Sequence, residues 1–301
     1  MSTDISERIP PPAAGEESPL TMLRIAVPNK GSLAETSATM LAEAGYTGRR
    51  DSKELHKADP ANGVEFFYLR PKDIATYVGS GALDVGITGR DLLKDARMPG
   101  AREIEALGFA GSTFRFAAPP GSFVELTDLE GSRIATSYPG LVDAFLDAHG
   151  VAVDLVPLDG AVESAVRLGV ADAVADVVET GTTLRQAGLE VFGPPLLQSE
   201  AVLISGPEDA PGTETLLRRL RGVMVARRYV MVDYDLPASL VDRAVDIAGG
   251  IESPTISPLR DPEWVAVRVM VAHKDVIRVM EELEALGASA ILETKIGNCR
   301  L

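Results

Sequence analysis

Residues 171–184 read Ala-Asp-Ala-Val-Ala-Asp-Val-Val-Glu-Thr-Gly-Thr-Thr-Leu, and this stretch decides the fold of the chain. Its apolar run predicts a strand, its Thr-Gly-Thr-Thr a tight turn, and the apolar spacing from Leu184 onward the start of a helix. Such a turn suits a phosphate, because backbone N–H groups, hydroxyls and the positive end of a helix converge there. Two acids at its mouth, Asp176 and Glu179, suit ribose hydroxyls or a magnesium ion, since carboxylates repel a bare phosphate. Glycine followed by threonine is also typical of a capped turn that binds nothing.

Length and charge narrow the class of protein. A chain of 301 residues is long for one core, so two or three domains are expected. The net charge of −15 argues against nucleic acid and anionic membranes as partners, although local sites for small anions remain possible. The single cysteine, Cys299, excludes an internal disulfide and fits a reducing compartment. Residues 1–21 are polar and lack a signal-peptide pattern, and no apolar run reaches the ~20 residues of a membrane helix, so we expect a disordered leader on a cytoplasmic protein.

From residue 22 onward, predicted strands alternate with predicted helices. Strands are expected at 23–28, 64–69, 85–88, between 104 and 118, and at 133–136 and 153–157, with a further strand in the apolar run that starts at Ala171. Helices are expected at 33–44, 73–78, after Gly89, and at 141–148 and 162–168, while His56 is expected in a polar loop. This alternation predicts an α/β fold with largely parallel sheets.

A repeated sequence pattern indicates two similar lobes. Leu-Arg-Ile-Ala at 23–26 is matched by Ser-Arg-Ile-Ala at 132–135, and Gly-x-x-Asp at 81–84 is matched by Gly-x-x-Asp at 169–172. In both copies the Gly-x-x-Asp precedes a strand, a glycine-containing turn and a helix. Because ligands bind at the carboxyl edge of open α/β sheets, we expect both turns to face one cleft.

The last third of the chain follows a different order. Residues 211–227 predict a connecting helix, followed by a βαββαβ series at 229–234, 238–248, 253–258, 265–272, 276–286 and 289–296. This order is that of the ferredoxin-like unit. We therefore expect a leader at 1–21, a first lobe at 22–110 and 196–210, a second lobe at 111–195, a connecting helix at 211–227 and a C-terminal domain at 228–301.

Three further turns carry candidate anion-binding residues. Lys30 and Gly31 follow the first strand, Arg70 follows the next, and Gly89, Arg90 and Asp91 follow the third. Lysine and arginine suit phosphates at such positions, although flanking surface charge has the same appearance. No His/Cys/Asp cluster has the spacing of metal ligands and no Ser/His/Asp order is recognisable, so the predicted chemistry does not need a nucleophilic side chain.

With these residues in view, the chain resembles the ATP phosphoribosyltransferase family, the first enzyme of histidine biosynthesis, in its long, self-regulated form. The resemblance rests on 24–31 (Arg-Ile-Ala-Val-Pro-Asn-Lys-Gly), 86–91 (Gly-Ile-Thr-Gly-Arg-Asp), 134–139 (Ile-Ala-Thr-Ser-Tyr-Pro), 176–184 and 252–259 (Glu-Ser-Pro-Thr-Ile-Ser-Pro-Leu). It implies two lobes like those of periplasmic binding proteins and a ferredoxin-like regulatory domain. It also implies a magnesium-dependent pentosyl transfer, in which N1 of ATP adenine displaces pyrophosphate from phosphoribosyl pyrophosphate, and a homo-oligomer between dimer and hexamer.

The resemblance also carries roles for single residues. The phosphoribosyl pyrophosphate site is expected at Asp176, Glu179, Thr180, Gly181, Thr182, Thr183 and Leu184, with Asp176 and Glu179 as the catalytic acids. ATP and pyrophosphate are expected at Lys30, Gly31, Arg70, Gly89, Arg90 and Asp91. The inhibitor histidine is expected at Asp235, Thr255 and Ala290, between regulatory domains; without the resemblance, Thr255 is simply a residue of a Pro-bounded strand.

Two other readings of the sequence stay open. A two-lobed sensor or transport receptor for a small anion shares the predicted lobes and performs no chemistry. A phosphoribosyltransferase of another type presents acids before a similar loop, but on a single domain that does not need the C-terminal unit.

Overall fold

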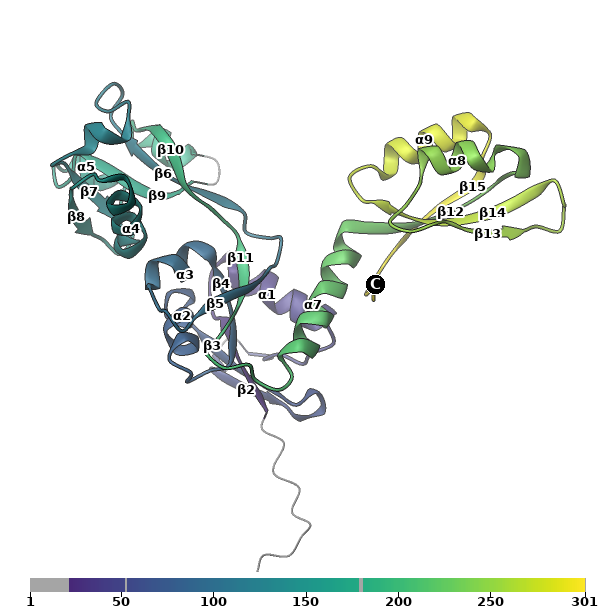
Figure 1. The fold of residues 1–301 in the computed structure, drawn as a ribbon, viewed down its shortest axis with the longest axis horizontal. Helices are drawn as coiled ribbons and strands as arrows, with labels where there is room; N and C mark the ends of the chain where they lie inside the picture. Colours follow the sequence, from purple (N-terminus) through teal and green to yellow (C-terminus); the bar gives the residue numbers. More distant parts are fainter. Residues whose placement is uncertain (1–21, 52, 179–180, 301) are drawn as a thin grey trace, which may run out of the picture.

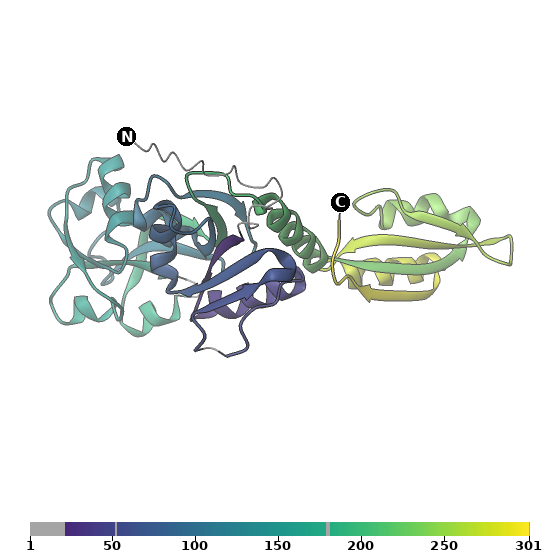
Figure 2. The same ribbon diagram turned by 90° about the horizontal axis from the view of Figure 1, so that it is seen from below.

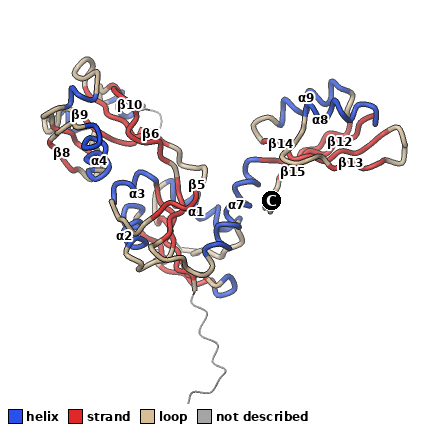
Figure 3. Tube along the Cα trace, in the orientation of Figure 1, coloured by secondary structure: helices blue, strands red, loops and turns tan. Residues whose placement is uncertain are grey.

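The computed structural model describes residues 22–51, 53–178 and 181–300, which form two α/β lobes and a separate C-terminal domain (Figures 1 and 3). The elements expected at 23–28, 64–69, 133–136 and 276–286 have these bounds in the structure. The chain is thus α/β as predicted, with a two-lobed region followed by a ferredoxin-like domain.

Lobe I is built on a six-stranded sheet in the order β2-β3-β1-β4-β11-β5. Its strands are β1 (Leu23–Pro28), β2 (His56–Asp59), β3 (Val64–Leu69), β4 (Val85–Gly89), β5 (Arg102–Ala106) and β11 (Ala201–Ser205). Helices α1 (Ser32–Glu43), α2 (Pro71–Gly79) and α3 (Arg90–Ala96) cover it, together with the 3₁₀ turn η1 (Pro60–Asn62). Strands β1, β4 and β11 are buried along almost their whole length, which explains their continuous apolar sequences.

Lobe II has a five-stranded sheet in the order β10-β6-β9-β7-β8. Its strands are β6 (Ser112–Ala118), β7 (Arg133–Thr136), β8 (Asp154–Pro157), β9 (Ala173–Val178) and β10 (Glu190–Ser199). The helices are α4 (Pro139–His149), α5 (Ser164–Arg167) and α6 (Thr182–Gln186), with η2 (Leu126–Leu129). The stretch that opened the sequence analysis therefore contains the central strand β9 and the start of α6, with Glu179 and Thr180 outside the described residues.

The repeated sequence pattern corresponds to an ion pair between arginine and aspartate in each lobe. Arg24 donates to Asp84 through its backbone N–H (2.8 Å) and its guanidinium (2.7 Å). Arg133 contacts Asp172 in the same way, at 2.9 Å and 2.8 Å. Each pair ties one parallel strand of a lobe, β1 or β7, to the start of the strand beside it, and both strand pairs, β1·β4 and β7·β9, are parallel. The repeated sequence thus encodes a repeated structure.

The chain passes between the lobes twice, after β5 and after β10. The two crossings lie side by side, because Leu107 N–H donates to the Ala201 carbonyl oxygen and Ala201 N–H to that of Phe109, both at 2.9 Å. Strand β10 pairs with β6 as far as Ser199, so the second crossing falls there rather than at residue 196. These returns make the sheets mixed and not largely parallel, since β11 is antiparallel to β4 and β5, and β6 is antiparallel to β9 and β10.

Two local predictions were also wrong. His56 begins the edge strand β2 and does not lie in a loop, because residues 56–59 pair with β3. Strands β10 and β11 were not expected, although Val202, Leu203 and Ile204 are fully buried. A five-residue apolar run is too short to be separated from a helix by periodicity alone. Among the described residues, every helix is too short or too polar to span a lipid bilayer.

The C-terminal domain has its own core and a four-stranded antiparallel sheet in the order β13-β14-β12-β15. It comprises β12 (Tyr229–Pro237), η3 (Ala238–Leu240), α8 (Val241–Ile247), β13 (Thr255–Pro258), β14 (Trp264–Ala272), α9 (Val276–Leu286) and β15 (Ser289–Lys295). Both helices cover one face of the sheet, and the other face is largely exposed (Figure 1). This is the predicted ferredoxin-like arrangement.

Helix α7 (Thr213–Arg228) leads from lobe I to this domain (Figure 2). Its apolar side, with Leu216, Leu220 and Val223, belongs to the core of lobe I, so the helix is anchored at its lobe I end. The chain returns after β15, where the Asn298 side chain donates to the Glu43 carbonyl oxygen (3.2 Å). The C-terminal domain therefore contacts lobe I through two segments.

Candidate functional site

A cleft of about 530 Å³ lies between the lobes. Lobe I contributes Lys30, Gly31, Ser32, Leu33, Arg70, Pro71, Lys72 and Leu92, and lobe II contributes Ser137, Tyr138 and Asp159. Three of the residues predicted to bind ATP or pyrophosphate, Lys30, Gly31 and Arg70, thus lie together in one cavity.

Topology explains why these residues meet. Strands β1 and β3 are parallel and end side by side at Pro28 and Leu69, so the turns that carry Lys30 and Arg70 leave the same edge of the sheet. In lobe II, β7 and β8 end side by side at Thr136 and Pro157, just before Ser137 and Asp159. The cleft is therefore bounded by the carboxyl edges of both sheets.

The lobe I wall of the cleft is positively charged. Lys30, Arg70 and Lys72 are exposed, and only Lys72 approaches a carboxylate, that of Asp159 at 3.7 Å. Within the described ranges, neither Lys30 nor Arg70 has an ion-pair partner. Helices α1 and α2 begin at the same wall and add the partial positive charge of their N-termini. Free cations beside two helix N-termini can hold a polyphosphate.

Tyr138 supplies the aromatic surface of the cleft. Its ring packs edge-to-face on Phe114 at 5.1 Å between centroids, so one side of the ring is fixed. Burial raises the pKa of the Tyr138 hydroxyl, and the carboxylates of Asp91 and Asp176 and a hydrogen bond to Asp91 raise it further. The hydroxyl therefore stays protonated.

Asp176 lies at the inner end of the predicted phosphate loop. Burial raises the pKa of its carboxyl group, partly offset by the hydrogen bond from the Val177 N–H (2.8 Å), and the nearby acids Glu163 and Asp91 raise it further. A half-buried carboxylate among other acids favours a neighbouring cation or hydroxyl donors.

The loop after β9 is described in part. Glu179 and Thr180, predicted as a catalytic acid and a phosphate ligand, lie outside the described residues. Gly181 adopts a left-handed conformation (φ 69°) at the start of α6, as a tight turn requires, and the side chains of Thr182 and Thr183 are exposed. Leu184 is buried in the core of lobe II, so only its backbone is available to a ligand.

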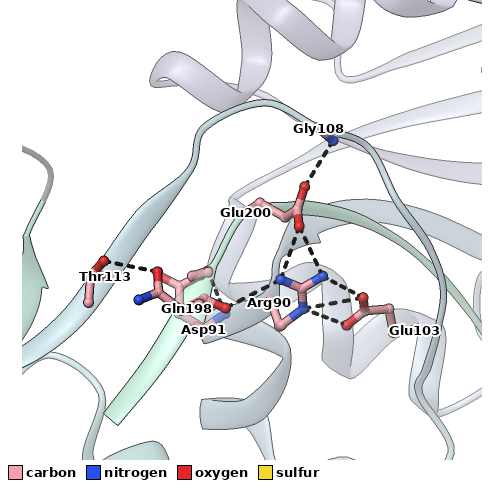
Figure 4. A network of polar contacts seen from close by, with 8 residues as sticks. Arg90, Asp91, Glu103, Gly108, Thr113, Gln198 and Glu200 are labelled. Carbon is pink, nitrogen blue, oxygen red and sulfur yellow. Dashed lines mark hydrogen bonds and ion pairs between the residues drawn. The ribbon is translucent and has the colours of Figure 1, made fainter. Parts of the chain in front are cut away.

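Arg90 is placed differently from the prediction. Its guanidinium donates to Glu103 at 2.7 Å and to Glu200 at 3.3 Å, and Glu200 in turn accepts the Gly108 N–H at 3.0 Å (Figure 4). Hydrogen bonding to Glu103 raises the pKa of the guanidinium. With two carboxylates already bound, Arg90 stabilises the crossing segments and does not line the cleft.

Its neighbours Gly89 and Asp91 are also structural in this arrangement. The buried Asp91 accepts a hydrogen bond from the Ser199 hydroxyl (2.9 Å), and its own N–H donates to that oxygen (3.0 Å). A side chain on Gly89 would overlap the Asp91 carboxylate. Neither residue lines the cleft, and their contact with ATP or pyrophosphate stays a prediction.

The sequence analysis assigned no role to three acids and bases near the cleft. These are Lys72, Asp159 and Glu163. Asp159 and Glu163 lie in the segment between β8 and α5. The pattern that selected the other turns, polar residues after the carboxyl end of a strand, would have found them.

The described residues offer few grouped side chains that could act as ligands of a metal ion. Among residues 22–51, 53–178 and 181–300, no three His, Cys, Asp or Glu side chains are close enough together to hold a metal ion. Asp176, near the end of β9, is a described acid whose carboxylate could contribute to binding a metal ion.

A second cavity, of about 330 Å³, opens on the exposed face of the C-terminal sheet. Asp235, Thr255 and Ala290, the predicted histidine ligands, all line it, together with Asp233, Tyr234, Ser257, Ala266, Val267, Arg268 and Leu292. The pairing of β12 with β15 shifts register between Asp233 and Asp235, and Ala290 lies in this bulge with φ 50°. Arg268 pairs with Asp233 at 2.7 Å, and the Asp235 carboxylate has no ion-pair partner in the described part of the chain.

Comparison with known proteins identifies relatives along the whole described chain. A family model described as "HisG: ATP phosphoribosyltransferase" matches residues 70–222, and one described as "HisG, C-terminal domain" matches 226–298. An ATP phosphoribosyltransferase of Arthrobacter sp. (strain FB24) is 60% identical over 287 residues, covering 93% of this chain and 100% of the relative. That of Salinispora tropica is 61% identical over 282 residues, with the same coverage.

A solved structure resembles the two-lobed part. A chain of the ATP phosphoribosyl transferase (HisG:HisZ) complex from Thermotoga maritima aligns with a TM-score of 0.58 and 26% identity. The alignment covers 66% of this chain and 97% of that one.

Proposed function

This chain belongs to the ATP phosphoribosyltransferase family, and from that premise we propose how its cleft holds the two substrates. The enzyme catalyses the first step of histidine biosynthesis, the transfer of the phosphoribosyl group of phosphoribosyl pyrophosphate to N1 of ATP adenine, with release of pyrophosphate. The single observation that carries the proposal is the cleft itself. Lys30 and Arg70, which have no ion-pair partner among the described residues, lie there across from Tyr138 of the opposite lobe.

The reaction asks the protein for orientation and charge stabilisation. The nucleophile is a nitrogen of one substrate and the leaving group, pyrophosphate, is already a good one. Alignment of two bound reactants can supply about 7–11 kcal/mol of the barrier. Cations beside the departing pyrophosphate stabilise the charge that develops on it. Lys30, Arg70 and Lys72, with the N-termini of α1 and α2, are placed to perform this role.

The loop after β9 is the proposed seat of the sugar donor. Thr180, Gly181, Thr182 and Thr183 would hold the 5-phosphate, and Asp176 and Glu179 the ribose hydroxyls. Micromolar binding needs about 8 kcal/mol. A helix dipole contributes only about 0.3–1 kcal/mol and a charge-assisted hydrogen bond about 1.5–3 kcal/mol. Several donors must therefore converge on the phosphate, as the hydroxyl-rich turn allows.

Magnesium is proposed as the cofactor, held chiefly by substrate oxygens. The chemistry it would supply is neutralisation of the pyrophosphate charge. Asp176 fits a role beside it, because it is an acid whose surroundings disfavour an isolated negative charge. The location we expect is the cytoplasm, in keeping with a chain whose single cysteine forms no internal disulfide.

Histidine is the proposed effector of the second cavity. An amino acid carries an ammonium group that Asp235 can accept and polar atoms that Thr255 and Ser257 can bind. Supporting this, the three residues expected from resemblance lie together on one exposed sheet face. We propose that a second copy of the chain covers this face in a homo-oligomer between dimer and hexamer.

One assay tests the proposal most directly: release of pyrophosphate when the protein is mixed with ATP and phosphoribosyl pyrophosphate, with and without histidine. We expect release that requires both substrates and falls when histidine is present. Asp176→Asn and Thr182→Val should each lower kcat/KM for phosphoribosyl pyrophosphate by about tenfold or more, the loss of one charge-assisted contact.

Thr39→Val is the matched control, because Thr39 is exposed on α1 and its hydroxyl bonds only the Glu35 carbonyl oxygen. It should keep wild-type kinetics. Unchanged kinetics in both loop variants would remove the loop from the site. Binding of both substrates without pyrophosphate release would favour the receptor reading.

A further inference from the structure

Helix α3 contacts lobe II or the crossing segments at both of its ends. At its N-terminus, Arg90 donates to the Gln198 carbonyl oxygen (3.3 Å) as well as to Glu200, and Asp91 exchanges hydrogen bonds with Ser199 (Figure 4). These partners belong to the strand that returns from lobe II. The helix is therefore attached to the segment that connects the lobes.

At its C-terminal end, α3 forms hydrogen bonds with the first turn of α4 in lobe II. Asp95 Oδ1 accepts the backbone N–H groups of Gly140 (2.8 Å) and Leu141 (3.1 Å). Arg97 Nε donates to the Gly140 carbonyl oxygen at 2.9 Å. A carboxylate bonded to the first N–H groups of a helix is an N-cap, and here the cap comes from the opposite lobe.

Gly140 shows that this contact is close. A Cβ at this position would overlap the backbone carbonyl oxygen of Asp95, and Gly140 is not among the residues with positive φ. The glycine is thus required by the neighbouring lobe and not by its own conformation. The accompanying ion pair between Arg97 and Asp143 (2.9 Å) is half-exposed and adds little.

The position of α4 matters because Ser137 and Tyr138, which line the cleft, immediately precede it. Any shift of the α4 N-terminus moves these residues relative to Lys30 and Arg70 on the facing wall. We propose that α3 is an interlobe strut and that Asp95 is a positioning residue: by capping α4 across the lobe boundary, it sets the width of the cleft in which the two substrates meet. This rests on the cleft being the active site proposed above.

Asp95→Ala tests the cap directly. It removes the acceptor for two N–H groups, and we expect kcat/KM for phosphoribosyl pyrophosphate to fall about tenfold, with KM raised for both substrates. Asp95→Asn keeps an acceptor oxygen of equal capping strength and should restore kcat/KM to within about twofold of wild type. Asp147→Ala is the matched control, because Asp147 is exposed near the other end of α4, and it should leave kinetics unchanged.

Gly140→Ala provides an independent test, because helix propensity and interlobe positioning predict different effects of this substitution on the reaction. Alanine favours a helix more than glycine does, so a purely local effect would stabilise α4 and leave the reaction unchanged. Interlobe positioning instead predicts a loss of kcat/KM at least as large as that of Asp95→Ala, with the secondary structure retained. A mere reduction in the folded fraction would lower kcat and leave KM at its wild-type value.

Wild-type KM values in both Asp95→Ala and Gly140→Ala would overturn the proposal. Equal losses in Asp95→Asn and Asp95→Ala would also overturn it, because a cap needs an acceptor and not a charge. Failure of the proposed function is distinguishable, since the wild-type protein would then release no pyrophosphate.

Discussion

Lys30, Arg70 and Arg90 all follow the carboxyl end of a strand in the first sheet, yet their surroundings differ. Within the described residues Lys30 and Arg70 have no carboxylate partner, whereas Arg90 has Glu103 and Glu200. In the sequence the three positions look alike. The acids that bind Arg90 lie 13 and 110 residues away in the sequence. Only the folded chain therefore distinguishes a cation that is available to a substrate from one that is bound to acids at a crossing segment.

The raised pKa of Asp176 has a consequence for stability. A carboxyl group whose folded-state pKa lies above its unfolded value binds its proton more tightly in the native state, so stability falls as the pH rises through this range. Asp176→Asn keeps the oxygen that accepts the Val177 N–H and removes the charge. We expect the variant to be more stable than wild type above the raised pKa, while it is less active.

Urea unfolding of both proteins at several pH values measures this effect. The difference in unfolding free energy should be constant at neutral pH and shrink on acidification toward 3.8, the ordinary pKa of the group. Asp147→Asn, at an exposed position, should show no such trend. A less stable Asp176→Asn at pH 7 would contradict the assignment of burial as the main cause.

Among the elements, the repeated Arg–Asp pair shows how each lobe joins two neighbouring parallel strands, β1 with β4 in lobe I and β7 with β9 in lobe II. The copies differ in exposure: the Asp84 side chain is 16% exposed and that of Asp172 is 40% exposed. Hydrogen bonding to Arg133 lowers the pKa of Asp172, so this pair loses its contribution as the pH falls through the lowered value. The same motif should therefore contribute more to lobe I than to lobe II.

Asp84→Ala should lower the unfolding free energy by about 1.5–3 kcal/mol, the range for hydrogen bonds to charged groups. Asp172→Ala should lower it less, because solvent screens the exposed pair. Urea denaturation of the two variants supplies the comparison, and each serves as the control for the other. Equal losses would show that exposure does not govern the strength of this pair.

At the scale of the whole molecule, the C-terminal segment packs back onto α7 and thereby joins the C-terminal domain to lobe I. A Cβ at Gly222 of α7 would overlap the Cys299 carbonyl oxygen and would lie 2.8 Å from Asn298 Oδ1. Asn298 in turn contacts α1, which begins at the cleft and ends beside this segment. A change in the C-terminal domain can thus reach α1, the helix that follows the Lys30 turn of the cleft.

Gly222→Ala should displace the C-terminal segment from α7. We expect basal pyrophosphate release to be retained and the histidine concentration for half-inhibition to rise about tenfold or more, a coupling loss of about 1.4 kcal/mol. Gly297→Ala is the matched control, because a Cβ there meets nothing within 4 Å and φ is not positive. Unchanged inhibition in Gly222→Ala would place the coupling elsewhere.

The sequence by itself determined the α/β class, the two lobes, the ferredoxin-like domain and most strand and helix positions. These depend on features local to the chain: hydrophobic periodicity, turn glycines and the repeated Gly-x-x-Asp. It also selected Lys30, Gly31 and Arg70, because polar residues after buried strands meet at one edge of a sheet.

Only the tertiary structure decided the mixed direction of the sheets, the role of Arg90 and the cap that Asp95 places on α4. Each of these depends on segments that come together because the chain passes between the lobes twice. Contacts of this kind join residues 45 to 110 positions apart, as between Asp95 and Gly140 or Arg90 and Glu200, and no local pattern encodes them. The physical reason is that strand and helix preferences act over a few residues, whereas the cleft is set by packing between lobes.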